Sequence, residues 1–211
     1  MSRHIPILPT IIVALALAAM IALGFWQLDR RHEKEAALKQ YRTNLTLPET
    51  AYPSNPTDAT YVFRTVTAHC LRIVGWQTKG GRLPNGTPGW RQIATCATGA
   101  EGPGLVVDIG ISADPEAVPA WNGGDVRGTA VWEPDSESAL QRWLGHRAPL
   151  RLMIVSDKGE AGLPPSPRPD PAEVPNNHLA YAVQWFLFAG VAVIIYGLAL
   201  RRRTKGPPPV P

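Results

Sequence analysis

The sequence has few of the residues from which catalytic and metal sites are built. Only two cysteines and five histidines are spread over 211 residues, and no histidines stand at a metal-binding spacing such as HExxH. There is no glycine-rich phosphate loop and no nucleophile elbow. The basic residues do not alternate with aromatic ones, as they do in surfaces that stack nucleic-acid bases. The sequence therefore predicts no enzyme, no metal site and no nucleic-acid partner.

Two long apolar runs, at 7–28 and 179–200, are the most informative features that the sequence does have. Each is close to the about 20 residues with which a helix crosses about 30 Å of hydrocarbon. Asn176 or Asn177 can cap the second helix by accepting a hydrogen bond from a free backbone N–H. The sequence thus predicts two transmembrane helices that hold one water-exposed domain, residues 29–175, against a lipid bilayer.

The first run is longer than the about 7–15 apolar residues of a signal peptide, so we expect it to be retained. Both runs carry small residues at helical packing intervals: Ala14, Ala18 and Ala22 in the first, and Gly190 and Gly197 in the second. Two interpretations stay open. These residues allow close packing against a partner helix, or they reflect how common alanine and glycine are in membrane helices.

Basic residues beside the runs predict the orientation. The tail 201–211 begins with three arginines, which favours the cytoplasm. A basic cluster within 30–42 argues for the opposite orientation, but long loops are translocated largely regardless of their charge. No acid-poor transit sequence rich in arginine and serine precedes residue 7. We therefore expect a two-pass protein of a bacterial inner membrane, with both termini cytoplasmic and the central domain periplasmic.

The central domain is expected to begin as a helix and to continue as β-structure. A charged stretch without proline or glycine extends the first helix to about residue 45. Alternating apolar residues then predict strands at 61–77, 90–97, 105–111, 125–132 and 150–155. A short helix is expected at 137–143. The predicted fold class is a membrane-anchored α+β protein in which two transmembrane helices flank a small, mostly antiparallel sheet or open barrel.

The two cysteines are expected to face each other across a hairpin. If Trp76 lies opposite Trp90, the same antiparallel register places Cys70 opposite Cys96. In an oxidising compartment the two thiols can form a disulfide; the alternatives are two buried thiols or, less favoured, a copper–thiolate site. Asp108 is unusual in an otherwise apolar strand, and a strand-end carboxylate with a local partner accounts for it.

Two segments near the ends resemble one known family. The stretch LGFWQLDR at 23–30 and the stretch PNNHLAYAVQWF at 175–186 are similar to the two end signatures of the surfeit-locus family of cytochrome c oxidase assembly proteins. In the middle, VRGT at 126–129 resembles a short strand of that family, whereas VDIGI at 107–111 departs from its usual Asn-Arg-Gly-Trp strand end. The resemblance implies an assembly factor for haem-copper cytochrome c oxidase that assists haem a delivery, with the catalytic subunit and other assembly factors as partners.

The resemblance also implies a haem a site at the outer membrane boundary. A neutral imidazole is the usual axial ligand of haem iron, and His178 would supply it at the start of the second helix. The residues expected to shape the pocket are Trp26, Gln27, Arg30, Tyr181 and Trp185. The alternative is a boundary histidine among interfacial aromatic residues. Two other functions stay open: a scaffold that binds no cofactor, and a thiol or copper carrier that uses Cys70 and Cys96.

Overall fold

The structure is a computed structural model that describes residues 6–99, 104–117, 119–134, 145 and 149–204. The chain divides into two compact units. We call Leu38–Val174 the sheet domain, and Met1–Ala37 together with Pro175–Pro211 the helix unit. The helix predicted at 137–143 lies outside the described residues.

The helix unit contains most of α1 (Ile7–Asn44) and all of α3 (His178–Thr204). Among the described residues, these are the two helices long and apolar enough to cross a membrane, and only 6% of each apolar window is buried. Asn177 precedes α3, and its carbonyl accepts from the backbone N–H of Tyr181 at 3.2 Å. Two such helices fit a membrane-anchored protein. At about 1.5 Å per residue α1 is about 57 Å long, more than one bilayer core requires.

Small residues let α1 and α3 approach each other closely. Gly24, Ala182 and Ala189 are buried between the helices. A Cβ atom added to Gly24 would lie 2.6 Å from the ring of Phe186. The helices therefore pack along a seam in which a glycine accommodates an aromatic ring.

The small residues singled out in the sequence do not form this seam. Ala14, Ala18 and Ala22 are exposed, and a Cβ added to Gly190 or Gly197 would meet nothing within 4 Å among the described residues. Of the two open interpretations, close packing by these residues does not hold for contacts within this chain. The regular spacing identified one face of each helix correctly, but it could not identify which face the other helix covers.

The sheet domain is built on one mixed sheet of seven strands in the order β1-β2-β6-β7-β5-β4-β3. The strands are β1 (Thr50–Ala51), β2 (Thr65–Cys70), β3 (Arg72–Arg82), β4 (Pro88–Ala97), β5 (Leu105–Ser112), β6 (Gly124–Trp132) and β7 (Leu152–Ser156). Two short 3-10 helices, η1 (Ala59–Tyr61) and η2 (Pro171–Glu173), complete the described elements. The strands predicted at 90–97, 105–111 and 125–132 are confirmed, and the last strand begins two residues later than predicted.

The prediction of a mostly antiparallel sheet was wrong. β1 runs parallel to β2, and β5 runs parallel to β7. The second parallel pair arises because β7 returns between β6 and β5 instead of extending the sheet at its edge. Alternating polarity along a strand does not report which neighbour the strand acquires, so the sequence pattern could not reveal this insertion.

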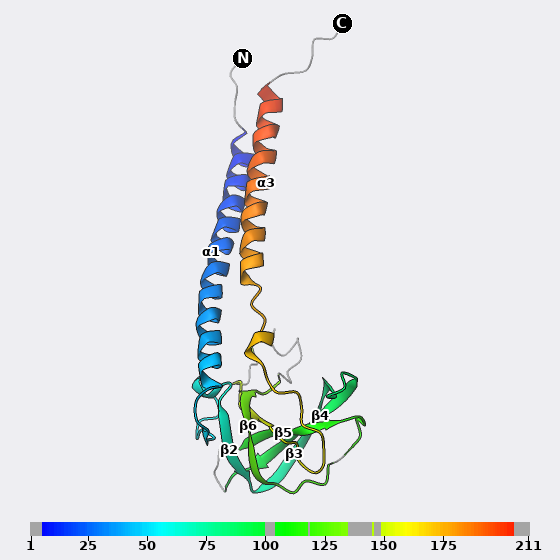
Figure 1. The fold of residues 1–211 in the computed structure, drawn as a ribbon. Helices are drawn as coiled ribbons and strands as arrows, with labels where there is room; N and C mark the ends of the chain where they lie inside the picture. The colour runs from blue at the N-terminus through cyan, green and yellow to red at the C-terminus, as the bar shows by residue number, and fades with distance from the viewer. Residues whose placement is uncertain (1–5, 100–103, 118, 135–144, 146–148, 205–211) are drawn as a thin grey trace. The chain divides into compact units, whose positions relative to one another are not determined.

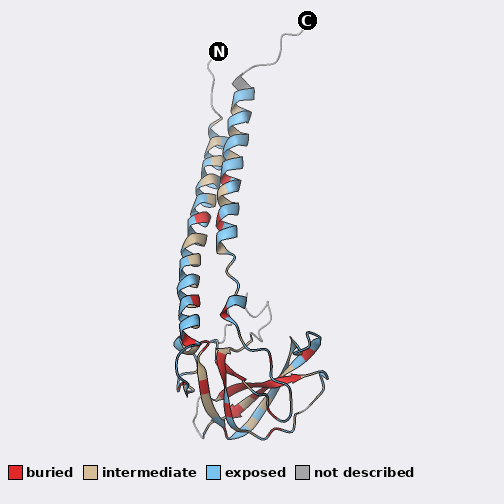
Figure 2. Cartoon of the chain, viewed as in Figure 1, coloured by how far each residue is buried: buried red, intermediate tan, exposed pale blue. Residues whose placement is uncertain are grey.

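The last residue of α1 and a disulfide both contribute to the core of the sheet domain. Asn44, 1% exposed, ends α1 and donates to the backbone carbonyls of Thr60 at 2.7 Å and Val62 at 2.8 Å. The buried side chains come from β2, β4, β5, β6 and β7. Figure 2 shows the buried parts of the strands in red. The buried side chains include Val66, Ala94, Leu105, Val107, Ile109, Ala130, Leu152 and Ile154.

The disulfide is confirmed, but the register from which it was argued was wrong. Cys70 and Cys96 are bonded, with their Cα atoms 5.4 Å apart. The predicted strand 61–77 is in fact two strands, β2 and β3, separated at Leu71. Trp76 lies opposite Ala94 rather than opposite Trp90. Cys70 thus ends β2 while Cys96 lies in β4, so the bond joins two strands that are not neighbours in the sheet.

Asp108 lies in the middle of β5 rather than at a strand end, and its side chain is fully buried. The guanidinium of Arg91 pairs with it at 2.5 Å, and the Ser166 hydroxyl donates to it at 2.8 Å. Burial raises the pKa of this carboxyl, although Arg91 and Ser166 act against that effect. Two partners close in space therefore explain why a carboxylate is buried here. One of them, Ser166, is distant in the sequence.

Candidate functional site

A hydrogen bond joins α1 and α3 where the two family-like segments meet. The Nδ1 atom of His178 lies 2.8 Å from the Oε1 atom of Gln27. An amide oxygen can only accept, so Nδ1 donates and the free lone pair of the imidazole lies on Nε2. Among the described residues, no hydrogen bond engages Nε2. In its neutral form the histidine therefore presents Nε2 as a ligand atom.

A second side-chain hydrogen bond closes the seam toward the other end of the helix pair. The Thr10 hydroxyl donates to the Pro6 carbonyl at 2.7 Å, and it accepts from the Tyr196 hydroxyl at 2.5 Å. In an apolar solvent, polar contacts of this kind between helices contribute to their association. The two contacts fix the register of α1 against α3, so that Gln27 faces His178.

Trp26 and Arg30 form a pair on one flank of α1. They are one turn apart, and the Arg30 guanidinium lies over the Trp26 ring, 5.7 Å from its centroid. Arg30 also pairs with Glu33 at 2.6 Å. The Trp26 side chain is 49% exposed. This flank thus presents an exposed aromatic ring beside a guanidinium that only a surface carboxylate holds.

Tyr181 and Trp185 lie on the side of α3 away from Phe186, whereas Trp26, about 200° around α1 from Gly24, projects away from α3. At about 100° per residue, Phe25 and Phe186 project toward one flank of the helix pair, where their rings meet edge to face at 5.5 Å. That contact shows which sides of the two antiparallel helices coincide. Tyr181 and Trp185 project away from it. Along α3, the positions from 178 to 185 span about 10 Å of helix rise.

The structure therefore brings some of the predicted site residues into contact and leaves others apart. His178 touches Gln27 and Trp26 touches Arg30. Tyr181 is 51% exposed, and the ring of Trp185 packs edge to face against Phe188 at 6.1 Å. No described contact joins these two aromatic residues to His178. They lie on the same helix as His178, up to about 10 Å further along it, and no described hydrogen bond links them to the site.

Sequence reasoning missed the residues that hold the two helices together. Gly24 and Phe186 allow the close approach that places Gln27 beside His178. Both belong to the two family-like segments, at 23–30 and 175–186. A glycine next to two aromatic residues near the end of an apolar run was the signal that could have indicated a close helix contact.

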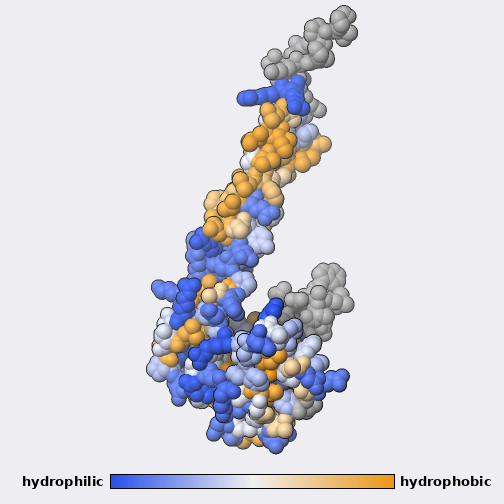
Figure 3. All heavy atoms as spheres, turned by 45° about the vertical axis from the view of Figure 1, so that its right-hand side comes forward, coloured by the Kyte–Doolittle hydropathy of each residue, from blue (hydrophilic) through white to orange (hydrophobic). Residues whose placement is uncertain are grey.

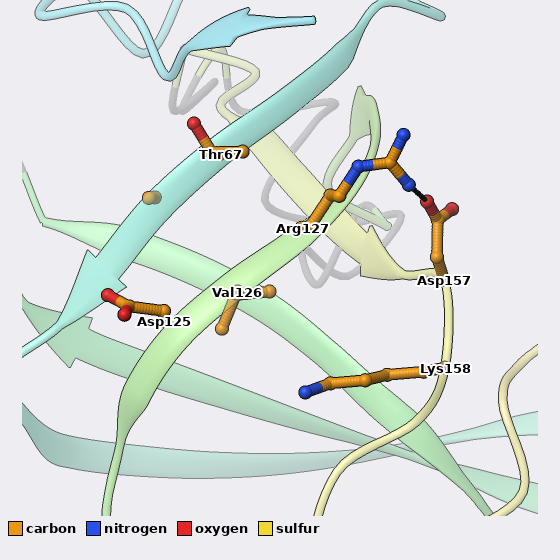
Figure 4. A pocket seen from close by; sticks show the side chains of 7 residues that line it. Thr67, Asp125, Val126, Arg127, Asp157 and Lys158 are labelled. Atoms are coloured by element: carbon orange, nitrogen blue, oxygen red, sulfur yellow. Dashed lines mark hydrogen bonds and ion pairs between the residues drawn. The ribbon is translucent and has the colours of Figure 1, made fainter.

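The sheet domain has a separate hollow of about 660 Å³ beside β2 and β6. It is lined by Thr67, Ala68, Asp125, Val126, Arg127, Asp157 and Lys158. Figure 4 shows Arg127 turned toward Asp157, to which it is paired. Arg127 also donates to Glu49 at 2.8 Å, and His69 pairs with Asp125 at 2.6 Å. Because protein groups already neutralise these charges, the hollow is a weak candidate for a cofactor site.

The described part of the chain offers no alternative metal site. No three His, Cys, Asp or Glu side chains within it form a group that could hold a metal ion. Cys70 and Cys96 are each 1% exposed and bonded to each other. The Gln27–His178 contact is therefore the best candidate for a functional site in the described residues.

Comparison with known protein families places this contact inside a family match. The model of the SURF1 family matches residues 14–190, a range that includes Gln27, His178 and the whole sheet domain. A search among curated proteins finds no match. The SURF1 family is associated with the assembly of cytochrome c oxidase, and it is a family of assembly factors rather than of known enzymes. Since the match covers well over half of the chain, this protein belongs to the SURF1 family, the surfeit-locus family of cytochrome c oxidase assembly factors.

Proposed function

We propose that this protein assists the maturation of a haem-copper oxidase by holding haem a at the Gln27–His178 contact and delivering it to the catalytic subunit. The observation that carries this proposal is the 2.8 Å hydrogen bond between Nδ1 of His178 and Oε1 of Gln27. It joins the two family-like segments at one level of the helix pair. A histidine held in this way resembles metal-ligating histidines, whose second ring nitrogen donates to a carbonyl or carboxylate oxygen.

The residues around the contact suit a porphyrin with acidic side chains. Haem a, when bound, would supply an iron whose axial position an imidazole nitrogen can fill. Gln27 accepts from Nδ1 of His178, which fixes the orientation of the ring and leaves Nε2 as the ring nitrogen available to a ligand. Trp26, Tyr181 and Trp185 offer aromatic surface on the two helices. Arg30 can exchange its exposed partner Glu33 for a propionate.

We further propose that the protein lies in a bacterial inner membrane with the sheet domain in the periplasm. The basic start of the C-terminal tail favours the cytoplasm, and a structural disulfide suits an oxidising compartment. Alkaline phosphatase fused after Gly145 should be active, and the same enzyme fused after Arg203 should be inactive. The reverse pattern would contradict this topology.

Two other functions compete with haem delivery. A thiol or copper carrier needs an accessible thiolate, but Cys70 and Cys96 are buried in the core and bonded to each other. This observation argues against the carrier. A scaffold that only holds oxidase intermediates would need no ligand at His178, and its distinguishing property is binding of oxidase subunits without cofactor.

Purification of the full chain from a host that makes haem a tests the proposal. Haem delivery predicts a Soret band in the purified protein, and the band should be that of haem a by pyridine haemochrome analysis. A host that lacks haem a synthesis provides the control. If oxidase subunits co-purify from the first host and no Soret band accompanies them, the scaffold is correct and the haem proposal is wrong.

A further inference from the structure

The edge strand β3 leaves a row of backbone groups without partners. It stands at one end of the seven-stranded order, and β4 is the only described strand that pairs with it. It extends over 11 residues, Arg72–Arg82. In an antiparallel pair, every second residue directs its N–H and C=O groups away from the partner strand, and in β3 a register shift between Ile73 and Gly75 interrupts this alternation once. The outer edge of β3 is thus a template on which another extended segment can pair.

A hollow of about 540 Å³ lies beside this edge. Five consecutive residues of β3, 72–76, form one wall, and Pro119, Trp121 and Asn122 from the loop before β6 form the other. Trp76 is 36% exposed and Val74 is 54% exposed. The hollow therefore combines an unpaired backbone edge with exposed apolar side chains, which is the arrangement that strand-adding peptides use.

The charged side chains of β3 itself all have one sign, and the Glu133 carboxylate contacts the strand at Gln77, at 3.4 Å. β3 contains Arg72, Lys79 and Arg82 and no acidic residue. None of these three forms an ion pair with a described residue, in contrast to Arg127 in the other hollow, which two carboxylates hold. Arg72 is also the only charged residue that lines the hollow beside β3. An acidic partner would be complementary to this edge.

We propose that the outer edge of β3 binds an extended, acidic segment of a partner protein, which adds to the sheet as a further strand. Backbone hydrogen bonds to β3 supply the pairing, and Val74 and Trp76 contact apolar side chains of the segment. Arg72 and Lys79, at the two ends of the covered stretch, pair with its carboxylates. That stretch is eight residues long, so an extended segment of about eight residues covers it. This site is independent of the helix unit and of the haem proposal.

Peptide binding to the full chain in nanodiscs of zwitterionic lipid tests the proposal. The probe is a fluorescent, end-blocked peptide of sequence EVTVEVTE, and its polarisation gives the Kd. The matched probes are KVTVKVTK and an EVTVEVTE peptide methylated on alternate backbone nitrogens. We expect EVTVEVTE to bind at least tenfold more tightly than either matched probe, because the first lacks the charge and the second lacks the backbone donors.

Variants of the chain locate the site. Arg72→Glu should weaken EVTVEVTE binding at least tenfold and reverse the preference toward KVTVKVTK. Trp76→Ala should weaken binding at least threefold. Lys158→Glu changes a basic residue that is 72% exposed at the other hollow, and it should leave the Kd within twofold. Circular dichroism checks that each variant remains folded.

Several results would overturn the proposal. Failure of EVTVEVTE to bind, or equal binding of its methylated form, would exclude strand addition. Quenching of tryptophan fluorescence by brominated lipid that Trp76→Ala reduces, without peptide binding, would assign the edge to the membrane surface. A dimer that Arg72→Glu dissociates would assign it to a second copy of this chain.

Discussion

In the sheet domain the large apolar side chains are buried, whereas in the helix unit they face outward. Ile93, Leu105 and Ile154 of the domain are 0% exposed. Leu15, Leu187 and Ile194 of the helices are more than 60% exposed. Figures 2 and 3 show the same contrast, with buried strands in the domain and a hydrophobic surface along the helices.

The contacts that hold each unit together also differ. The domain is held by apolar packing and one disulfide. The helix pair is held by a glycine, by small residues and by two side-chain hydrogen bonds. The hydrophobic effect accounts for both patterns. In the domain, apolar side chains avoid water by packing in a core, whereas on the helices they avoid it by contacting lipid. The difference teaches that exposure has the opposite meaning in the two units.

The largest effect should come from placing a charge on the outer surface of a helix. Ile194→Asp changes a side chain that is 62% exposed, yet we expect membrane insertion to become less favourable by about 4 kcal/mol. Leu71→Asp in the domain changes a side chain that is 56% exposed and should shift stability by less than about 0.5 kcal/mol. Carbonate extraction measures the first effect and urea unfolding the second. Equal tolerance of both would mean that lipid does not surround α3.

Removal of the disulfide should weaken the sheet domain and leave the helix unit unchanged. The bond closes a loop of 26 residues, and a loop of this length corresponds to about 3 kcal/mol of stability. Cys70→Ala combined with Cys96→Ala should lower the free energy of unfolding of the domain by that amount in urea titrations. The helical signal of the membrane-inserted part is the internal control. An unchanged unfolding midpoint would show that the bond does not restrain the unfolded chain.

Added volume in the helix seam should have a smaller effect. Gly24→Ala places a Cβ atom 2.6 Å from the flexible end of Phe186, and such overpacking costs about 1–2 kcal/mol. Gly190→Ala is the matched control, since its Cβ meets nothing within 4 Å. Thermal unfolding in detergent micelles, followed at the helical signal, compares the two. Phe186→Leu should partly restore Gly24→Ala. A larger loss in Gly190→Ala would mean that α3 turns a different face to α1.

The smallest effect should appear only at high pH. Burial raises the pKa of Tyr52 from 10.0 to about 12, and its hydroxyl donates to the Leu152 carbonyl at 2.8 Å. The unfolded chain loses this proton from about pH 10, so the contribution to stability is complete below pH 10 and is lost as the pH rises through 12. Tyr52→Phe should flatten this part of the stability profile in urea titrations. A profile identical to that of the unmodified chain would place Tyr52 in water.

Features that depend on local pattern could be predicted from the sequence. The apolar runs and the strands around Trp90, Leu105 and Asp125 each depend on residues whose spacing is regular. Features that depend on strand neighbours could not be predicted in this way. The insertion of β7 beside β5 and the break at Leu71 depend on contacts between segments far apart in the chain.

The candidate site was predictable in part for the same reason. Two family-like segments pointed to His178 and Gln27, and the structure shows them in contact. The seam that places them together depends on Gly24 and Phe186, and regular spacing of alanines drew attention to the wrong helix face.

At Gly128 the sequence showed only a glycine in a strand. The structure shows why it is needed, since a Cβ there would lie 2.0 Å from the Val155 carbonyl oxygen.

The absorption spectrum of the purified His178→Ala variant tests the central claim most directly. The variant is expressed in a haem a-producing host, alongside the unmodified chain, Gln27→Ala and His32→Ala. We predict that His178→Ala loses or strongly shifts the Soret band while the protein stays in the membrane. Gln27→Ala should weaken the band, and His32→Ala should leave it unchanged, because His32 lies on α1 away from the Gln27–His178 contact. An unchanged spectrum in His178→Ala would contradict the account and would make His32 the next ligand to test.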